Sequence, residues 1–234
     1  STMTSSATFA TTASITGVTT GTYMVTVSDA NSCTSTSSVT ITEPTAVVAS
    51  SVVNTSINCN GGSNGSATVS GSGGTSPYTY LWSNSATTAS ITGVSAGTYT
   101  VTVSDANLCT STSSVTITEP TAVVASSVMN TSISCNGGSN GSATASGTGG
   151  TSPYTLAWSN SATTVTTNGR VAGTYTVTVS DVNSCTSTSS VTITEPVVLT
   201  ASTGMNTNVS CNGGSNGSAT ASGTGGTSPY TFVW

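Results

Sequence analysis

Six cysteines are the most regular of the few residues in this chain that could do chemistry. They are Cys33, Cys59, Cys109, Cys135, Cys185 and Cys211, and the gaps between them alternate between 26 and 50 residues. Cysteines repeated in this way in small β-rich units are typical of disulfides formed in an oxidising, extracellular compartment. A zinc site is a poor alternative, because the chain has no CxxC motif and no histidine to complete four ligands.

The remaining ionisable groups are too sparse for acid–base catalysis. The chain has six acids, a single cation (Arg170), no lysine and no histidine. Asp29, Asp105 and Asp181 each begin a short turn, where aspartate is favoured because its side chain hydrogen-bonds to the nearby backbone. We therefore expect no enzyme and no cofactor. A weak calcium site at the module junctions is the alternative, although calcium prefers six to eight oxygen ligands.

A block of 76 residues recurs along the chain, and it sets the scale of the folding unit. Residues 21–44, 97–120 and 173–196 are nearly identical, and each block ends in Glu-Pro. A strict period of this length predicts a tandem array of small modules rather than one globular enzyme. Proline cannot donate to a sheet, so the Glu-Pro pairs indicate the module boundaries. The predicted division is a partial module over 1–44 with the last strands, complete modules over 45–120 and 121–196, and a partial module over 197–234 with the first strands.

Each period predicts short strands separated by turns, with no helical pattern. In the period 45–120 we expect strands over 46–57, 66–70, 78–82, 89–94, 97–104 and 109–118, and about seven strands in all. This pattern favours an all-β fold of tandem immunoglobulin-like antiparallel β-sandwich modules in a rod or filament. We expect core positions for six aromatic residues: Tyr78, Trp82, Tyr99, Tyr154, Trp158 and Tyr175. The Gly-Thr-Tyr entry to one strand is similar to a tyrosine corner, in which the hydroxyl holds a loop.

Composition limits the partners. Only 3% of residues are charged and the net charge is −5, so nothing can neutralise nucleic-acid phosphates or attract an anionic membrane surface. No apolar run approaches the roughly 20 residues that a transmembrane helix needs. Ser1 is neither a start methionine nor the beginning of a signal peptide, and we expect a mature fragment of something longer.

Four short blocks together resemble a known family. They read Cys-Asn-Gly, Gly-Gly-Thr-x-Pro-Tyr, Gly-Thr-Tyr-x-Val-x-Val and Asp-x-Asn-x-Cys, and they resemble the SprB-type repeat of Bacteroidetes surface proteins. The resemblance implies large secreted adhesins and filaments of the bacterial cell surface, some of which act in gliding motility. It implies no catalytic residues. The chain departs from such repeats by carrying less Asp, Lys and Gln than is usual.

Two schemes of cysteine pairing fit the spacing, and each meets an objection. Pairing within a repeat joins Cys59 to Cys109 and Cys135 to Cys185, although these turns lie at opposite ends of an immunoglobulin sandwich. Pairing across a junction joins cysteines 26 residues apart and requires a sharp fold-back at Glu-Pro. We favour the first scheme, which leaves Cys33 and Cys211 for a bond between subunits.

The expected function is structural and adhesive. Because residues 7–234 span three whole periods cut within a module, subunits joined head to tail would complete each other's half-modules and form a filament. A longer chain is the other explanation. The alternative function is a carbohydrate-binding array that holds surface glycans through many weak sites.

Overall fold

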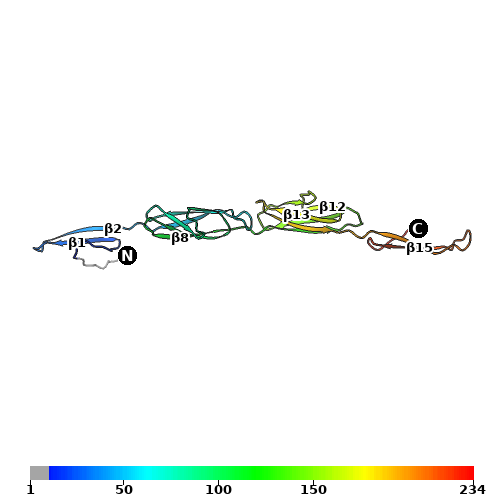
Figure 1. Cartoon of the computed structure of the whole chain (residues 1–234), viewed down its shortest axis with the longest axis horizontal. Coiled ribbons are helices and arrows are strands. Elements are labelled where there is room, and N and C mark those ends of the chain that lie inside the picture. Colours follow the sequence, from blue (N-terminus) through cyan, green and yellow to red (C-terminus); the bar gives the residue numbers. More distant parts are fainter. Residues whose placement is uncertain (1–10) are drawn as a thin grey trace. The chain divides into compact units, whose positions relative to one another are not determined.

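The computed structural model describes residues 11–234, so the first ten residues of the predicted partial module 1–44 lie outside the described residues (Figure 1). Every regular element in the described part is a β-strand, and neighbouring strands pair antiparallel. The all-β prediction is therefore confirmed. No helix among these residues is long and apolar enough to cross a membrane. The four-part division at the Glu-Pro pairs stays a prediction.

The first repeat (residues 45–120) contains six strands, one for each of the six predicted ranges and one fewer than the expected count of about seven. They are β3 (Val48–Thr55), β4 (Gly65–Ser72), β5 (Thr79–Trp82), β6 (Ser90–Val94), β7 (Gly97–Ser104) and β8 (Thr110–Ile117). The sheets have the orders β3-β4-β6 and β5-β7-β8. These orders match the two sheets of a constant-type immunoglobulin domain without its D strand. The D strand is missing because only residues 83–89 connect β5 to β6.

The second repeat (residues 121–196) has the same topology. Its strands are β9 (Val124–Thr131), β10 (Gly141–Thr148), β11 (Thr155–Trp158), β12 (Thr166–Arg170), β13 (Gly173–Ser180) and β14 (Thr186–Ile193). The sheets have the orders β12-β10-β9 and β11-β13-β14. Ser127 Oγ and Ser189 Oγ lie 2.8 Å apart and join the edges of the two sheets at β9 and β14.

The two end segments each form one strand pair. On the N-terminal side β1 (Gly21–Ser28) pairs with β2 (Thr34–Ile41), and on the C-terminal side β15 (Thr200–Thr207) pairs with β16 (Ser218–Thr224). These pairs correspond in sequence to β7–β8 and to β3–β4. The N-terminal pair therefore belongs to one of the two sheets of a whole sandwich, and the C-terminal pair belongs to the other.

Strict alternation of side chains builds the core, because successive residues of a strand point to opposite faces. In the second repeat Val177 and Val179 of β13 are fully buried, and the intervening threonine lies on the other face. They pack in one cluster with Ala143 of β10 and with Trp158. At Gly141 an added Cβ would lie 2.6 Å from Ile193 Cγ2, so the sheets approach too closely there for a side chain.

The six predicted core aromatics divide into two kinds. Trp82 and Trp158 are 2% and 3% exposed, and each indole N–H donates to a backbone carbonyl, of Thr88 at 2.9 Å and of Thr164 at 3.0 Å. The four tyrosines are half-buried, and each hydroxyl donates to a backbone carbonyl four or five residues upstream. Their acceptors are Gly73 for Tyr78, Ser95 for Tyr99, Gly149 for Tyr154 and Val171 for Tyr175. The tyrosines thus hold loops at the edge of the core.

Candidate functional site

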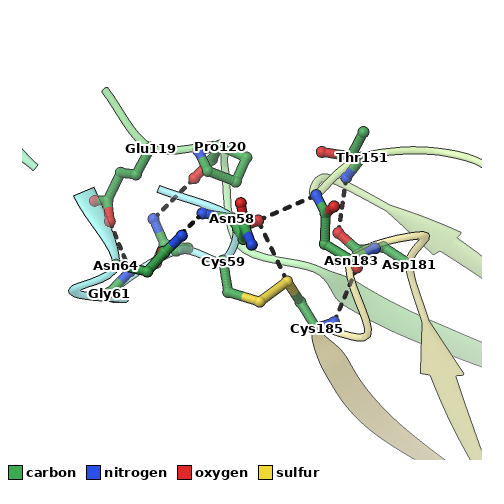
Figure 2. The surroundings of a disulfide bond; sticks show 11 residues. Asn58, Cys59, Gly61, Asn64, Glu119, Pro120, Thr151, Asp181, Asn183 and Cys185 are labelled. Carbon is green, nitrogen blue, oxygen red and sulfur yellow. Dashed lines mark hydrogen bonds between the residues drawn. A yellow bond between two sulfur atoms is a disulfide. The ribbon is translucent and has the colours of Figure 1, made fainter. Parts of the chain in front are cut away.

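The turn that follows β3 holds the linker that leaves the first repeat. The turn closes on itself through Gly62 N–H, which donates to Cys59 O at 2.9 Å. Gly61 N–H donates to the Glu119 carboxylate at 2.6 Å, and Asn60 Nδ2 donates to Pro120 O at 3.1 Å (Figure 2). The Glu-Pro pair therefore does more than end a strand, because both of its residues are bonded to the turn around Cys59.

The turn between β13 and β14 forms the other side of the junction. The Asp181 carboxylate accepts the N–H groups of Asn183 and Cys185, each at 2.9 Å. This confirms the local role that the sequence predicts for the aspartate. A third N–H, from Thr151, also donates to it at 2.9 Å, although Thr151 lies 30 residues upstream. This contact could not be predicted from the sequence, since nothing in the local pattern relates the Gly-Gly-Thr turn to the aspartate.

Burial and hydrogen bonding act in opposite directions on these carboxylates. In the first repeat the Thr75 N–H has the largest effect on Asp105, and with the N–H groups of Cys109 and Asn107 it lowers the pKa against the opposing effect of burial. For Asp181 burial is the largest effect and raises the pKa, but its three N–H donors together leave the pKa below the ordinary value. Both groups are therefore ionised at neutral pH and act as acceptors.

A disulfide joins the two turns across the junction (Figure 2). Cys59 bonds to Cys185 with the Cα atoms 5.6 Å apart, and the two cysteines are 126 positions apart in sequence. Beside the disulfide, Asn183 Nδ2 donates to Asn58 O at 3.3 Å. The expectation of disulfide chemistry is confirmed for this one pair, which connects the first repeat to the second.

The pairing that we favoured from the sequence is wrong. The structure forms neither Cys59–Cys109 nor Cys135–Cys185, and it forms no bond between cysteines 26 residues apart. The reason is the direction of the strands. Because β3 and β8 run the same way and each has eight residues, Cys59 after β3 and Cys109 before β8 lie about 26 Å of strand apart. Cys59 instead meets the turn between β13 and β14 of the second repeat.

The other cysteines are exposed and free: Cys33, Cys109, Cys135 and Cys211. For each of them, the position 126 residues away that would repeat the observed bond lies beyond residues 1–234. The free thiols are therefore consistent with a single pairing rule, in which the Cys-Asn-Gly cysteine of one repeat bonds the Asp-x-Asn-x-Cys cysteine of the next.

The linker that leaves the second repeat is held as the first one is. Gly137 N–H donates to the Glu195 carboxylate at 2.7 Å, and Asn136 Nδ2 donates to Pro196 O at 3.1 Å. The neighbouring Cys135 is one of the free thiols. The turn around Cys135 thus holds its linker with the same hydrogen bonds as the turn around Cys59. Cys135 itself forms no disulfide.

The polar groups on the exposed faces mostly satisfy one another. Thr98 Oγ1 pairs with Thr116 Oγ1 and Thr174 Oγ1 with Thr192 Oγ1, each at 3.0 Å across two neighbouring strands. Within residues 11–234, no group of three or more His, Cys, Asp or Glu side chains is placed to hold a metal ion. The chemistry that this arrangement contains is one disulfide at the junction between two repeats.

A comparison with protein families supports two of the four sequence blocks, Cys-Asn-Gly and Gly-Gly-Thr-x-Pro-Tyr, which lie within the matched segments. Three segments match the SprB repeat, over residues 51–87, 130–163 and 203–234. The predicted resemblance is confirmed at these segments, each of which includes a Cys-Asn-Gly turn. SprB repeats occur in cell-surface proteins and are typical of structural or adhesive rather than catalytic chains. No curated protein sequence matches the chain.

Several solved structures are similar to this chain at low sequence identity. An amphioxus IgVJ-C2 molecule is 12% identical with a TM-score of 0.27, and the match covers 65% of this chain and 98% of that chain. Immunoglobulin domains of Dpr2 in complex with DIP-Theta are 12% identical with a TM-score of 0.31, covering 75% and 73%. Fibronectin(III)-like modules of Clostridium thermocellum CbhA are 14% identical with a TM-score of 0.25, covering 62% and 94%. The immunoglobulin-like assignment itself rests on the sheet order.

Proposed function

We propose that this chain is a tension-bearing segment of an extracellular bacterial surface adhesin or filament, in which disulfides carry load from one module to the next. The bond between Cys59 and Cys185 carries the proposal, because it joins two repeats rather than the parts of one. The SprB match supports an adhesin-type protein of the cell surface. The low content of ionisable groups supports a structural rather than a catalytic role.

The disulfide changes the path that a pulling force follows through the chain. Force that enters from the N-terminal side reaches Cys59 and crosses the sulfur–sulfur bond directly to Cys185. The strands from β4 to β13 lie between these cysteines and are bypassed by the covalent path. These strands can unfold thermally, but they cannot lengthen the chain while the bond is intact.

Overlap between successive bonds would extend this protection along an array. The bonded cysteines are 126 residues apart, which exceeds the 76-residue period. A bond from the next Cys-Asn-Gly turn, at Cys135, would therefore start inside the loop that Cys59–Cys185 closes. An array built on this rule resists extension at every junction, which suits an attachment structure exposed to shear.

Single-molecule stretching of the full chain between its termini tests the proposal. The oxidised chain is expected to release less contour length than the reduced chain, by about 440 Å for the 126 residues hidden behind the bond, at roughly 3.5 Å per residue. Cys59→Ser is expected to behave as the reduced chain does under oxidising conditions. Cys109→Ser removes a free thiol and serves as the matched control, with the wild-type length. Equal contour lengths for oxidised wild type and Cys59→Ser would overturn the proposed role.

A further inference from the structure

Asn-Gly pairs recur in the two whole repeats, and this dipeptide reacts with itself in water. The backbone nitrogen of the glycine attacks Cγ of the asparagine side chain, because glycine has no Cβ to hinder the approach. The side-chain nitrogen leaves as ammonia, and a five-membered succinimide ring remains. Residues 45–196 contain five such pairs, which begin at Asn60, Asn64, Asn136, Asn140 and Asn168.

The pair that begins at Asn60 is held at both of its reacting groups. Gly61 N–H, which would supply the attacking nitrogen, donates to the Glu119 carboxylate at 2.6 Å. Asn60 Nδ2, which would leave, donates to Pro120 O at 3.1 Å (Figure 2). Attack requires Gly61 N to lose its proton, and a carboxylate beside it disfavours the anion that results. The equivalent pair at Asn136 has the same two bonds, at 2.7 and 3.1 Å.

The pairs that begin at Asn64 and Asn140 are held through the other side-chain atom. Asn64 Oδ1 accepts the N–H of Asn58 at 3.1 Å. Asn140 Oδ1 accepts the N–H of Ser134 at the same distance. The glycine that follows each of them is buried at the start of β4 or β10. Closing the ring would therefore break a hydrogen bond and move a buried part of the backbone.

The pair that begins at Asn168 lacks these restraints. Asn168 is exposed, and among the described residues its side chain has no hydrogen-bond partner. Asn168 and Gly169 fall at an irregularity of β12, where the pairing with β10 passes from Thr167 directly to Arg170. A Cβ added at Gly169 would have its nearest neighbour at 3.8 Å, so the surroundings leave room for the ring.

Neither exposure nor the backbone of the glycine distinguishes Asn168 from the pairs at the two Glu-Pro linkers. Asn60 and Asn136 are exposed as well. The glycine φ angles are also alike, at +73° for Gly61, +76° in the second repeat and +66° for Gly169. The hydrogen bonds to Glu-Pro are therefore the difference between these pairs.

We propose that Asn168 is a site of spontaneous deamidation and that the Glu-Pro pairs protect the junction asparagines from the same reaction. Gly169 N gives its proton to water and bonds to Asn168 Cγ, and the side-chain nitrogen takes up a proton and leaves as ammonia. Water then opens the succinimide at either carbonyl and yields aspartate or isoaspartate. No oxidant or enzyme is needed, and a neutral side chain on β12 becomes a carboxylate. The first repeat lacks this site, because Thr92 stands at the equivalent position.

The test keeps the full, oxidised chain at neutral pH and follows each pair over time by peptide mapping and mass spectrometry. Deamidation at Asn168 is expected to be about tenfold faster than at Asn60 or Asn136, because two hydrogen bonds restrain each of those pairs. In the reduced chain unfolded by denaturant the three rates should converge. Asn168→Thr, which copies the first repeat, should remove the main acidic species that ion-exchange chromatography separates from the aged chain.

Glu195→Ala tests the protection separately. It should raise the rate at Asn136, whereas Asn60 in the same molecule keeps Glu119 and serves as the matched control. A rate at Asn136 that stays the same or falls would overturn the protective role, and a fall would identify the carboxylate as a base.

The proposed site has its own contrary result. Deamidation at Asn168 that is no faster than at Asn60 in the folded chain would overturn it. None of these rates depends on force transmitted through Cys59–Cys185, so the inference stands or fails independently of the tension-bearing role.

Discussion

At the scale of single residues, Asp105 and Asp181 each accept three backbone N–H groups. Asp105 is 3% exposed, and its carboxylate accepts Asn107, Cys109 and Thr75 N–H at 2.9, 2.8 and 2.9 Å. Asp29 keeps the two local bonds, to Asn31 and Cys33 N–H, but is exposed. Asp29 therefore shows the local turn bonds alone, whereas Asp105 also makes the long-range bond to Thr75.

Replacing both buried aspartates should lower stability in a pH-dependent way. The variant Asp105→Asn with Asp181→Asn is expected to unfold at a lower temperature at pH 7, because an amide cannot accept all three N–H groups. Folded-state pKa values are lowered, so the wild-type advantage is present above the ordinary aspartate pKa of about 3.9 and is lost as the pH falls through the lowered values. Thermal unfolding followed by circular dichroism from pH 7 to pH 2 measures this.

The control is Asp29→Asn, which removes the same charge from a turn without the third donor. Its effect on the unfolding temperature should be smaller. A difference between wild type and the double variant that does not shrink in acid would contradict the ionised-acceptor role.

At the scale of elements, the alternation of apolar and polar residues predicts the positions of strands well. It does not predict the number of strands in a module. The strand over 97–104 was predicted with the bounds that β7 has, because threonine and valine alternate along its whole length. The expected count of about seven strands is one too high, because the short turn 83–89 between β5 and β6 leaves no room for a D strand. The length of the segment between two strands therefore indicates whether a further strand can lie between them.

The strand β5 provides a sharp test of the core. Trp82→Ala is expected to reduce the free energy of unfolding by about 3–5 kcal/mol, because it leaves a cavity and removes the indole from a buried site. Leu81→Ala, one residue earlier and 56% exposed, should change it by less than about 0.5 kcal/mol. Denaturant unfolding of both variants gives the comparison. Similar losses at the two positions would contradict the assigned faces of β5.

At the scale of the whole molecule, the disulfide adds a long-range connection that the strand pattern does not contain. It joins turns that lie beyond the ends of strands in different repeats, and hydrogen bonds of Glu119 and Asn183 stand on either side of it (Figure 2). The junction is therefore both covalently and non-covalently linked.

The single tryptic site offers a direct check of the bond. Arg170 lies between Cys59 and Cys185, so a denatured, unreduced chain with its free thiols blocked should be cut into two fragments that stay linked. Cys59→Ser should release the fragments without reductant, whereas Cys135→Ser should not. A non-reducing gel measures this, and release from the Cys135 variant would indicate the Cys135–Cys185 pairing instead.

The sequence by itself determined the 76-residue period, the positions of most strands and the absence of a catalytic set, because these follow from local patterning and composition. It also placed cysteines where disulfides form. Only the tertiary structure decided which cysteines meet. Spacing of 26, 50 or 126 residues is equally compatible with a bond, and the choice depends on which strand ends lie at the same end of a sandwich. That arrangement depends on sheet topology, which keeps Cys59 a strand's length from Cys109 and leaves it to meet the turn between β13 and β14 of the next repeat.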